Sequence, residues 1–267
     1  MKMIAISIVS HGHGQMIEGA LHSIALSAGS CCQHILVLLT LNRPEAELEA
    51  RLKNISWRFE LRIINNIQSI GYGANHNKAF SALDDPVSFK WFVIMNPDIV
   101  WPKDTNDFWY GLCSDPQPET IGMICPQQID LVGMRQDFAR SLITPMSLFN
   151  RLLLRLFDNF NKQKILSVRQ ADWVNGACMV WRADVFSMLN GFDDHYFMYC
   201  EDTDICLRLQ LAGYRMCESP VSVIHDAQRQ TGRSWHHLRW HLRSLVRLWS
   251  SATYWKYVYS RLVVNVN

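Results

Sequence analysis

The sequence predicts an α/β fold in which helices cover both faces of a mostly parallel β-sheet. Up to residue 95, short apolar runs alternate with segments of helical periodicity, as in successive strand–helix units. The runs are continuous rather than alternating, which is typical of strands buried on both faces. Hydrophobic residues make up 49% of the 267 residues and charged residues 19%, so the chain can bury a sizeable core.

Four strands and three helices are expected in the first half. The strands are residues 3–9, 34–41, 61–65 and 90–95, and the helices are residues 15–28, 44–54 and 74–83. Pro44 favours a helix start, because proline is tolerated in the first turn. The glycine turn at 71–73 precedes the third helix. Ligands bind such sheets at the carboxyl ends of the strands, where polar turns follow the first and fourth strands.

The second half is more mixed. It contains an amphipathic segment at 146–157, a strand at 171–182, helices at 183–190 and 201–212, a strand within 214–224 and a basic helix at 234–249. No internal repeat or low-complexity linker separates these segments. The parts are therefore expected to pack as one unit.

The charge is distributed unevenly along the chain. After Asp226 there are seven basic residues and no acidic one, so a net charge of +2 divides into a body of −5 and a tail of +7. This asymmetry suggests a body that performs chemistry and a tail that contacts an anionic surface. Two interpretations of the tail remain open: a membrane-surface helix, or a helix that packs its apolar face on the body. Its regularly spaced residues are Leu238, Leu242, Leu245 and Trp249, and Arg239, Arg243 and Arg247.

Cysteine usage and hydropathy indicate a protein of a reducing compartment. The eight cysteines include no CxxC pair, so reduced thiols are expected rather than a zinc site. The N-terminal apolar run lacks a small-residue cleavage site and is interpreted as a strand rather than a signal peptide. The longest apolar stretches, 35–41 and 152–157, are too short to span a bilayer. A cytoplasmic protein that is not integral to the membrane is therefore expected.

Acidic residues stand at two places where chemistry is plausible. Asn96-Pro97-Asp98 ends the fourth strand, where a carboxylate can hold a divalent cation against a diphosphate, or the tripeptide is simply a turn. Glu201-Asp202-Thr203-Asp204 opens a helix after an aromatic run. The helix dipole favours acids there, and Thr203 or Asp204 can cap, yet three acids in four positions exceed what capping requires. One of them can serve as a general base for a sugar hydroxyl.

Three further features have both a structural and a functional interpretation. His225 is a structural histidine, or it shares a metal ion with Asp98. The turn at 71–77 is one in which the backbone approaches a ligand closely, although its glycine spacing does not fit a dinucleotide fingerprint. Trp173 is a buried core residue, or it stacks on a sugar whose hydroxyls bind Asp172 and Asn175.

The order and spacing of these motifs resemble family 2 glycosyltransferases with the GT-A fold. The series is VSHGHG, GYGANHNKA, MNPDI, DWVNGACMVWR, GFDDHYFMYCEDTDICLRLQLAGYR and VIHD, and the resemblance covers residues 4–247. It is similar to bacterial O-antigen rhamnosyltransferases that use dTDP-L-rhamnose. The resemblance implies a Rossmann-like, mostly parallel sheet flanked by helices, followed by a basic helical tail. It divides the chain into a nucleotide-sugar-binding half (1–125), an acceptor and catalytic half (126–226) and the tail (227–267).

The resemblance also implies roles for individual residues. Asp98 matches the last acid of a DxD motif that binds Mg²⁺ or Mn²⁺, His225 matches a histidine that completes the metal site, and Asn96 replaces the first acid. Asp202 matches the catalytic base, with Glu201 as the fallback. The residues implied in nucleotide or donor binding are Ser10, His11, Gly71, Asn75, Asn77, Asn96, Asp98 and Arg233, and those around donor sugar and acceptor are Asp172, Trp173, Asn175 and Gly176.

One departure from the family pattern concerns the nucleobase. Many members end the second strand with an Asp-Asn pair, whereas this chain has Leu39 and Thr40. The resemblance implies an inverting transfer from a nucleotide-sugar donor, best dTDP-L-rhamnose, to a polyprenyl-diphosphate-linked saccharide at the inner face of a bacterial inner membrane. The alternatives are another UDP-, dTDP- or GDP-sugar donor, a catalytically silent scaffold, or a membrane- or nucleic-acid-binding module that uses the basic tail. No nucleic-acid partner is expected on the preferred interpretation.

Overall fold

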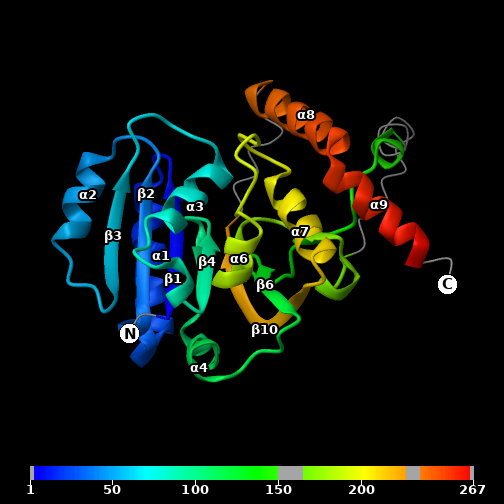
Figure 1. The fold of residues 1–267 in the computed structure, drawn as a ribbon. Coiled ribbons are helices and arrows are strands. Elements are labelled where there is room, and N and C mark those ends of the chain that lie inside the picture. Colours follow the sequence, from blue (N-terminus) through cyan, green and yellow to red (C-terminus); the bar gives the residue numbers. More distant parts are fainter. Residues whose placement is uncertain (1–2, 150–164, 227–234, 265–267) are drawn as a thin grey trace.

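The computed structural model describes residues 3–149, 165–226 and 235–264, and Figure 1 shows a central sheet between helices. The eight strands of this sheet run in the order β3-β2-β1-β4-β9-β6-β10-β5. Four of the seven neighbouring pairs are parallel, namely β1–β2, β1–β4, β2–β3 and β6–β10. The expected mostly parallel α/β sheet is confirmed.

The first half folds as expected. Strand β1 (Ile4–Ser10) lies between β2 (Ile35–Leu41) and β4 (Trp91–Met95), with β3 (Glu60–Asn65) outside β2. Every residue of β2 and β4 is buried, which explains their continuous apolar sequences. The connecting helices are α1 (Gly14–Ser27), α2 (Ala46–Lys53) and α3 (Tyr72–Ser81). Helix α3 begins two residues earlier than expected, so Gly73 lies inside it.

The second half adds antiparallel strands. Strand β9 (Cys178–Arg182) runs antiparallel to both β4 and β6 (Ile121–Ile129), and β5 (Ile99–Val100) runs antiparallel to β10 (Arg215–His225). The prediction of a single strand at 171–182 is wrong. A turn at 175–177 divides it into β9 and β8 (Trp173–Val174), and β8 pairs with β7 (Ala139–Arg140) in a separate two-stranded sheet.

Helices of the second half are α4 (Asn106–Ser114), α6 (Ala183–Met188) and α7 (Glu201–Leu211). Neither α4 nor β6 was predicted from the sequence. Because side chains alternate along a strand, β1 directs Ile4, Ile6 and Ile8 into a core with α1 and Ala5 into another with α3, α6 and α7. Short 3₁₀ helices occur at Gly29–His34, Pro86–Ser88, Lys103–Thr105 and Val168–Gln170.

The basic tail forms helices α8 (Trp235–Ser250) and α9 (Ala252–Val264), which lie at the opposite end of the molecule from α2 (Figure 1). A third buried cluster joins them to the body and contains Tyr196, Cys200, Leu207, Leu245, Leu248, Tyr254 and Tyr257. Packing on the body is thus confirmed for one face of the tail. No described helix is long and apolar enough to span a bilayer. Most of the amphipathic segment at 146–157, and Arg233, lie outside the described residues.

Candidate active site

Asp98 and His225 come together at the end of the sheet. His225 is the last residue of β10 and pairs with Ile99 of β5, so Asp98, one residue before β5, lies beside it. His225 Nε2 lies 3.5 Å from Asp98 Oδ2. Both side chains are largely buried, with 10% and 15% exposed. The two side chains thus lie next to each other, and their sharing of a metal ion stays a prediction.

Two glutamines determine which nitrogen of His225 carries its proton. Gln136 donates from Nε2 to the carbonyl oxygen of His225 (2.7 Å), so its Oε1 is left to face His225 Nδ1 at 3.1 Å. Gln128 Oε1 also lies 3.1 Å from Nδ1. Two acceptors place a proton on Nδ1, and the other ring nitrogen, Nε2, is directed at Asp98. Metal-binding histidines are oriented in this way by such partners.

The donor set fits a divalent cation. Asp98 Oδ1 is buried and has no hydrogen-bond partner among the described residues, although a buried carboxylate oxygen normally has one. With Nε2 of His225, this oxygen offers two ligands. No cluster of three or more His, Cys, Asp or Glu side chains suited to a metal occurs in the described part of the chain. Mg²⁺ often has only one or two protein ligands, because water and substrate phosphates complete its shell.

Asn96 serves a different function from Asp98. Its Oδ1 lies 3.1 Å from the Tyr72 hydroxyl, and its backbone N–H donates to Ala177 O at 2.8 Å. Tyr72 also donates to the carbonyl oxygen of Gly176 at 2.7 Å. Asn96 therefore ties the turn that carries Asp98 to α3 and to the turn at 175–177.

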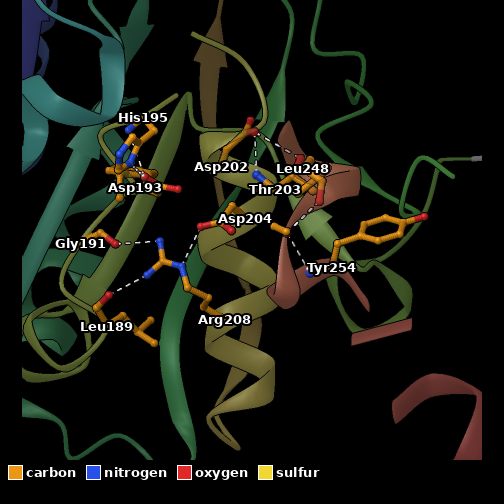
Figure 2. A network of polar contacts seen from close by, with 12 residues as sticks. Leu189, Gly191, Asp193, His195, Asp202, Thr203, Asp204, Arg208, Leu248 and Tyr254 are labelled. Atoms are coloured by element: carbon orange, nitrogen blue, oxygen red, sulfur yellow. Dashed lines mark hydrogen bonds and ion pairs between the residues drawn. The ribbon is translucent and has the colours of Figure 1, made fainter. Parts of the chain in front are cut away.

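The acidic cluster opens α7, and its three acids have three different environments. Tyr199 and Cys200 both have left-handed backbones (φ 72° and 65°), which turn the aromatic run abruptly into the helix. Asp204 pairs with Arg208 at 2.7 Å, and Arg208 also binds the carbonyl oxygens of Leu189 and Gly191, as Figure 2 shows. The expected capping by Thr203 or Asp204 is wrong, because no described side chain caps α7. Asp204 is instead half of a buried ion pair.

Asp202 is the half-buried acid of the cluster. Its Oδ1 accepts the Thr203 backbone N–H at 2.7 Å, and its Oδ2 accepts the Gly176 N–H at 3.2 Å (Figure 2 shows the Thr203 contact). Burial raises the pKa of Asp202, although the two N–H groups and the positive charge of Arg140 lower it. A carboxylate in this setting is a stronger proton acceptor than one in water.

Glu201 is fully enclosed. Its Oε2 has no hydrogen-bond partner in the described structure, and only 5% of the residue is exposed. Burial, followed by the negative charge of Asp202, raises the pKa of Glu201 well above its usual range. Since Asp202 has the hydrogen-bond donors and Glu201 lacks comparable ones, a single shared proton resides on Glu201 and leaves Asp202 ionised.

A polar network joins the Asp98–His225 pair to the neighbouring acids Glu201 and Asp202. Gln128 contacts His225 and exchanges two hydrogen bonds with Asn175, at 2.6 and 3.0 Å, and the next residue, Gly176, donates to Asp202. Burial raises the pKa of the Tyr72 phenol, and the negative charges of Asp202 and Asp98 are close enough to raise it further. Asp98, His225 and Asp202, which lie far apart in the sequence, are thus linked through one polar network.

The glycine turn packs closely against the protein's own backbone. A Cβ on Gly71 would lie 2.6 Å from the carbonyl oxygen of Phe197, which explains the need for glycine at this position. Asn75 is fully buried and bonds to Ile70, Gly71 and Asn66. The Asn77 side-chain amide donates to the Phe192 carbonyl oxygen and to Asp194, and it accepts a hydrogen bond from the Phe192 N–H. Both amides hold loops in place, and nucleotide binding by them stays a prediction.

Asp172 and Trp173 are also engaged within the protein. Asp172 accepts hydrogen bonds from the Leu142 N–H (2.7 Å) and the Tyr257 hydroxyl (2.8 Å), which anchors α9. Trp173 is 6% exposed, donates to Ser141 O and has the Arg140 guanidinium over its ring. This burial contradicts stacking of Trp173 on a sugar and supports the structural interpretation.

The loop after β1 is held by an acid that sequence reasoning missed. The buried Ser10 hydroxyl donates to Glu45 at 2.6 Å, and the Gly12 N–H binds the same oxygen. His11 is exposed beside Asn42. Thr40, one of the two positions at which the family resemblance implies an Asp-Asn pair, is buried with no described partner for its hydroxyl. Sequence reasoning also missed Tyr72, Gln128 and Gln136. The available signal for Gln128 was the polar pair Gln127-Gln128 within the otherwise apolar run 121–129.

Fold and site together define the class of protein. An α/β sheet of this order, with an Asp–His pair at its carboxyl edge linked by a polar network to a further carboxylate, is that of a GT-A glycosyltransferase. Two structures support the fold. The Pyrobaculum calidifontis mannosyltransferase PcManGT, solved with GDP-Man and Mn²⁺, matches with a TM-score of 0.59 and 16% identity over 91% of this chain and 64% of its own. S. aureus TarS 1-349, solved with UDP-GlcNAc, matches with a TM-score of 0.62 and 10% identity over 94% and 68%.

The chain belongs to glycosyltransferase family 2, because the model of "Glycosyltransferase like family 2" matches residues 2–245. Among its relatives, the rhamnosyltransferase WbbL of Escherichia coli K12 is 30% identical over 92% of both chains. The N-acetylglucosaminyl-diphospho-decaprenol L-rhamnosyltransferase of Mycobacterium tuberculosis is 27% identical over 86% of this chain and 78% of its own. The family implied by the motifs is confirmed.

Proposed function

We propose that the protein transfers L-rhamnose from dTDP-L-rhamnose to a polyprenyl-diphosphate-linked saccharide, with inversion, in the synthesis of a cell-surface polysaccharide such as O-antigen. The relatives named as rhamnosyltransferases support the sugar, and the relative named for a decaprenol-linked substrate supports the acceptor. The observation that carries the proposal is the polar network that links the Asp98–His225 pair to Asp202.

Asp202 is the proposed general base. The acceptor hydroxyl gives its proton to this carboxylate while its oxygen forms a bond to the anomeric carbon, and the bond from that carbon to the diphosphate breaks. The diphosphate leaves with the electron pair. Glu201 keeps its own proton and contributes no second negative charge next to the base, and Gly176 N–H orients the Asp202 oxygen that it binds.

Asp98 and His225 are proposed to hold Mg²⁺ or Mn²⁺ through Oδ1 and Nε2. Such a cation, when bound, neutralises negative charge on a diphosphate. Gln128 and Gln136 keep the His225 proton on Nδ1, so that Nε2 stays available. Ser10, His11, Asn96 and Arg233 remain proposed contacts of the nucleotide side, Arg233 lying outside the described residues, and Asn175 and Gly176 remain proposed contacts of the sugar or acceptor.

A membrane surface is the proposed setting, with α8 as the contact. The outward face of α8 exposes Trp235, Leu238, Leu242 and Val246, at 85%, 42%, 50% and 60%. Arg239 and Arg243 are exposed among them. Apolar side chains at helical spacing, flanked by arginines and without any acid, suit an anionic leaflet such as the inner face of a bacterial inner membrane.

Liposome pelleting tests this surface. Each cation near an anionic leaflet contributes about 1 kcal/mol, so Arg239→Gln with Arg243→Gln should weaken binding by about 30-fold. Arg51→Gln with Lys53→Gln, on α2 at the far end of the molecule in Figure 1, is the matched control and should bind as the wild type does. Equal binding by both variants would count against α8.

A donor screen tests the activity itself. Release of dTDP, UDP or GDP is measured with each nucleotide sugar, a lipid-linked acceptor and Mn²⁺. Preferential turnover of dTDP-L-rhamnose is expected. Turnover of a UDP- or GDP-sugar instead would retain the enzyme class but refute the donor, and no turnover of any donor would refute the proposal.

A further inference from the structure

The Tyr72 hydroxyl lies where three functional segments meet. Tyr72 is the first residue of α3, and its hydroxyl is 2.7 Å from the carbonyl oxygen of Gly176 and 3.1 Å from Asn96 Oδ1. Neither acceptor has a proton to give at these atoms, so the phenol is the donor to both. Nothing in the sequence motifs distinguished this residue.

Each acceptor leads to one part of the site. Asn96 lies two residues before Asp98, in a turn whose backbone is fixed by the Asn96 N–H bond to Ala177 O. Gly176 donates its N–H to Asp202 Oδ2 at 3.2 Å. One hydroxyl thus connects the turn that carries Asp98 with the backbone group that orients Asp202.

The phenol is itself held rigidly. Its ring packs edge-on against His76 (4.6 Å between centroids), and its backbone N–H donates to Phe197 O at 2.9 Å. His76 is completely buried with Nδ1 2.8 Å from the Ser7 hydroxyl, and burial lowers its pKa to about 3, so it is neutral. Gly176 leaves room for the ring, because a Cβ there would lie 3.2 Å from a Tyr72 ring carbon.

The hydroxyl also stays protonated. Burial raises the pKa of Tyr72 well above its usual range, and the negative charge of the neighbouring Asp202 raises it further. The phenol is therefore a hydrogen-bond donor throughout the working pH range and not a proton acceptor.

We propose that Tyr72 is a positioning residue that fixes the distance between the Asp98–His225 pair and the Asp202 carboxylate, through its shared hydrogen bond to Asn96 and Gly176. This inference rests on the proposed function. A displacement of about 1 Å between reacting groups costs on the order of 100-fold in rate, so a single hydroxyl at this junction affects turnover more than stability.

Tyr72→Phe tests the inference, since it removes one oxygen and keeps the ring. We expect kcat to fall by about 10–100-fold, as for other residues that orient reacting groups, with little change in KM for donor and acceptor. Tyr257→Phe is the matched control for stability, because it loses a buried phenol bond of 2.8 Å to Asp172 outside the network. Both variants should lose similar thermal stability, while only Tyr72→Phe loses kcat.

A double-mutant cycle separates positioning from a general structural effect. Asn96→Ala removes one acceptor, so Tyr72→Phe should cost less kcat in that background than in the wild type. Full additivity, or a kcat for Tyr72→Phe equal to that of Tyr257→Phe, would overturn the inference. If Tyr72→Phe does not fold, a wild-type kcat for Asn96→Ala would also overturn the inference. A wild type without transferase activity would instead refute the proposed function.

Discussion

Replacement of Asp202 by asparagine is the sharpest test of the active site. Removal of a general base costs about 10²–10⁴-fold in rate, which corresponds to about 3–5 kcal/mol of transition-state stabilisation. The folded state should lose far less. The introduced asparagine would keep one carbonyl oxygen for either the Gly176 or the Thr203 N–H, so only one backbone hydrogen bond, worth about 0.5–1.5 kcal/mol, is lost.

Glu201→Gln is the matched variant at the neighbouring position. Glu201 is already neutral in the wild type, because burial and Asp202 raise its pKa, so glutamine preserves its charge and nearly its shape. At most one hydrogen bond is altered, which limits the loss of kcat to about tenfold. The two substitutions therefore separate the base from its neighbour.

The assay is the initial rate of nucleotide release at saturating donor, acceptor and Mn²⁺, with thermal unfolding and dTDP binding measured on the same preparations. Wild-type turnover by Asp202→Asn would refute the assignment of the base. An equal loss in Glu201→Gln would transfer that role to Glu201.

Three further predictions follow from the site. Gln136→Leu removes a partner that keeps the His225 proton on Nδ1, so the half-saturating Mn²⁺ concentration should rise about 10–100-fold, and an unchanged Mn²⁺ titration would contradict the proposed tautomer. The folded state binds the Glu201 proton more tightly than the unfolded chain does, so the stabilisation from this group is present at low pH and is lost as pH rises through its raised pKa. Glutamine does not titrate, so the thermal midpoint of Glu201→Gln minus that of the wild type should grow from about pH 5 to about pH 8. A constant difference would be inconsistent with a raised pKa. Arg208→Met leaves Asp204 as an uncompensated buried charge and should destabilise the fold by about 3–5 kcal/mol in urea unfolding, whereas Arg208→Met with Asp204→Asn should recover part of that loss; no recovery would show that the carbonyl contacts of Arg208, and not the ion pair, stabilise the loop.

The parallel half of the fold was predictable because its strands are buried on both faces and read as continuous apolar runs, as in 35–41 and 91–95. The antiparallel half was less accessible. Strand β6 includes Pro126, Gln127 and Gln128, which interrupt its apolar pattern, and the turn at 175–177 divides an apparently continuous strand. In both places, pairing with distant strands outweighs the local pattern.

The order of motifs singled out Asp98, His225 and Asp202, which the structure links in one network and whose roles stay predictions. The residues that orient them were not singled out. Tyr72 reaches Gly176 across 104 positions, and Gln128 and Gln136 reach His225 across 97 and 89. Such contacts depend on strand order, which local periodicity does not encode. The capping and Trp173 interpretations failed for the same reason, because each of these residues binds another part of the chain.

Helix α8 has one exposed side and one side that packs on the body, and this limits what a truncated protein can reveal. Its exposed side carries Leu238 and Leu242, while on the other side Arg247 binds Asp193 at 2.7 Å and Ser244 binds Met198 O at 2.8 Å. Those two partners belong to the segment that leads into the proposed catalytic acids. Truncation before residue 235 would therefore remove the exposed side chains proposed to meet lipid and the supports of the proposed active site in one step, and inactivity of a truncated protein would not report on lipid binding. Only point substitutions confined to the exposed side separate the two roles.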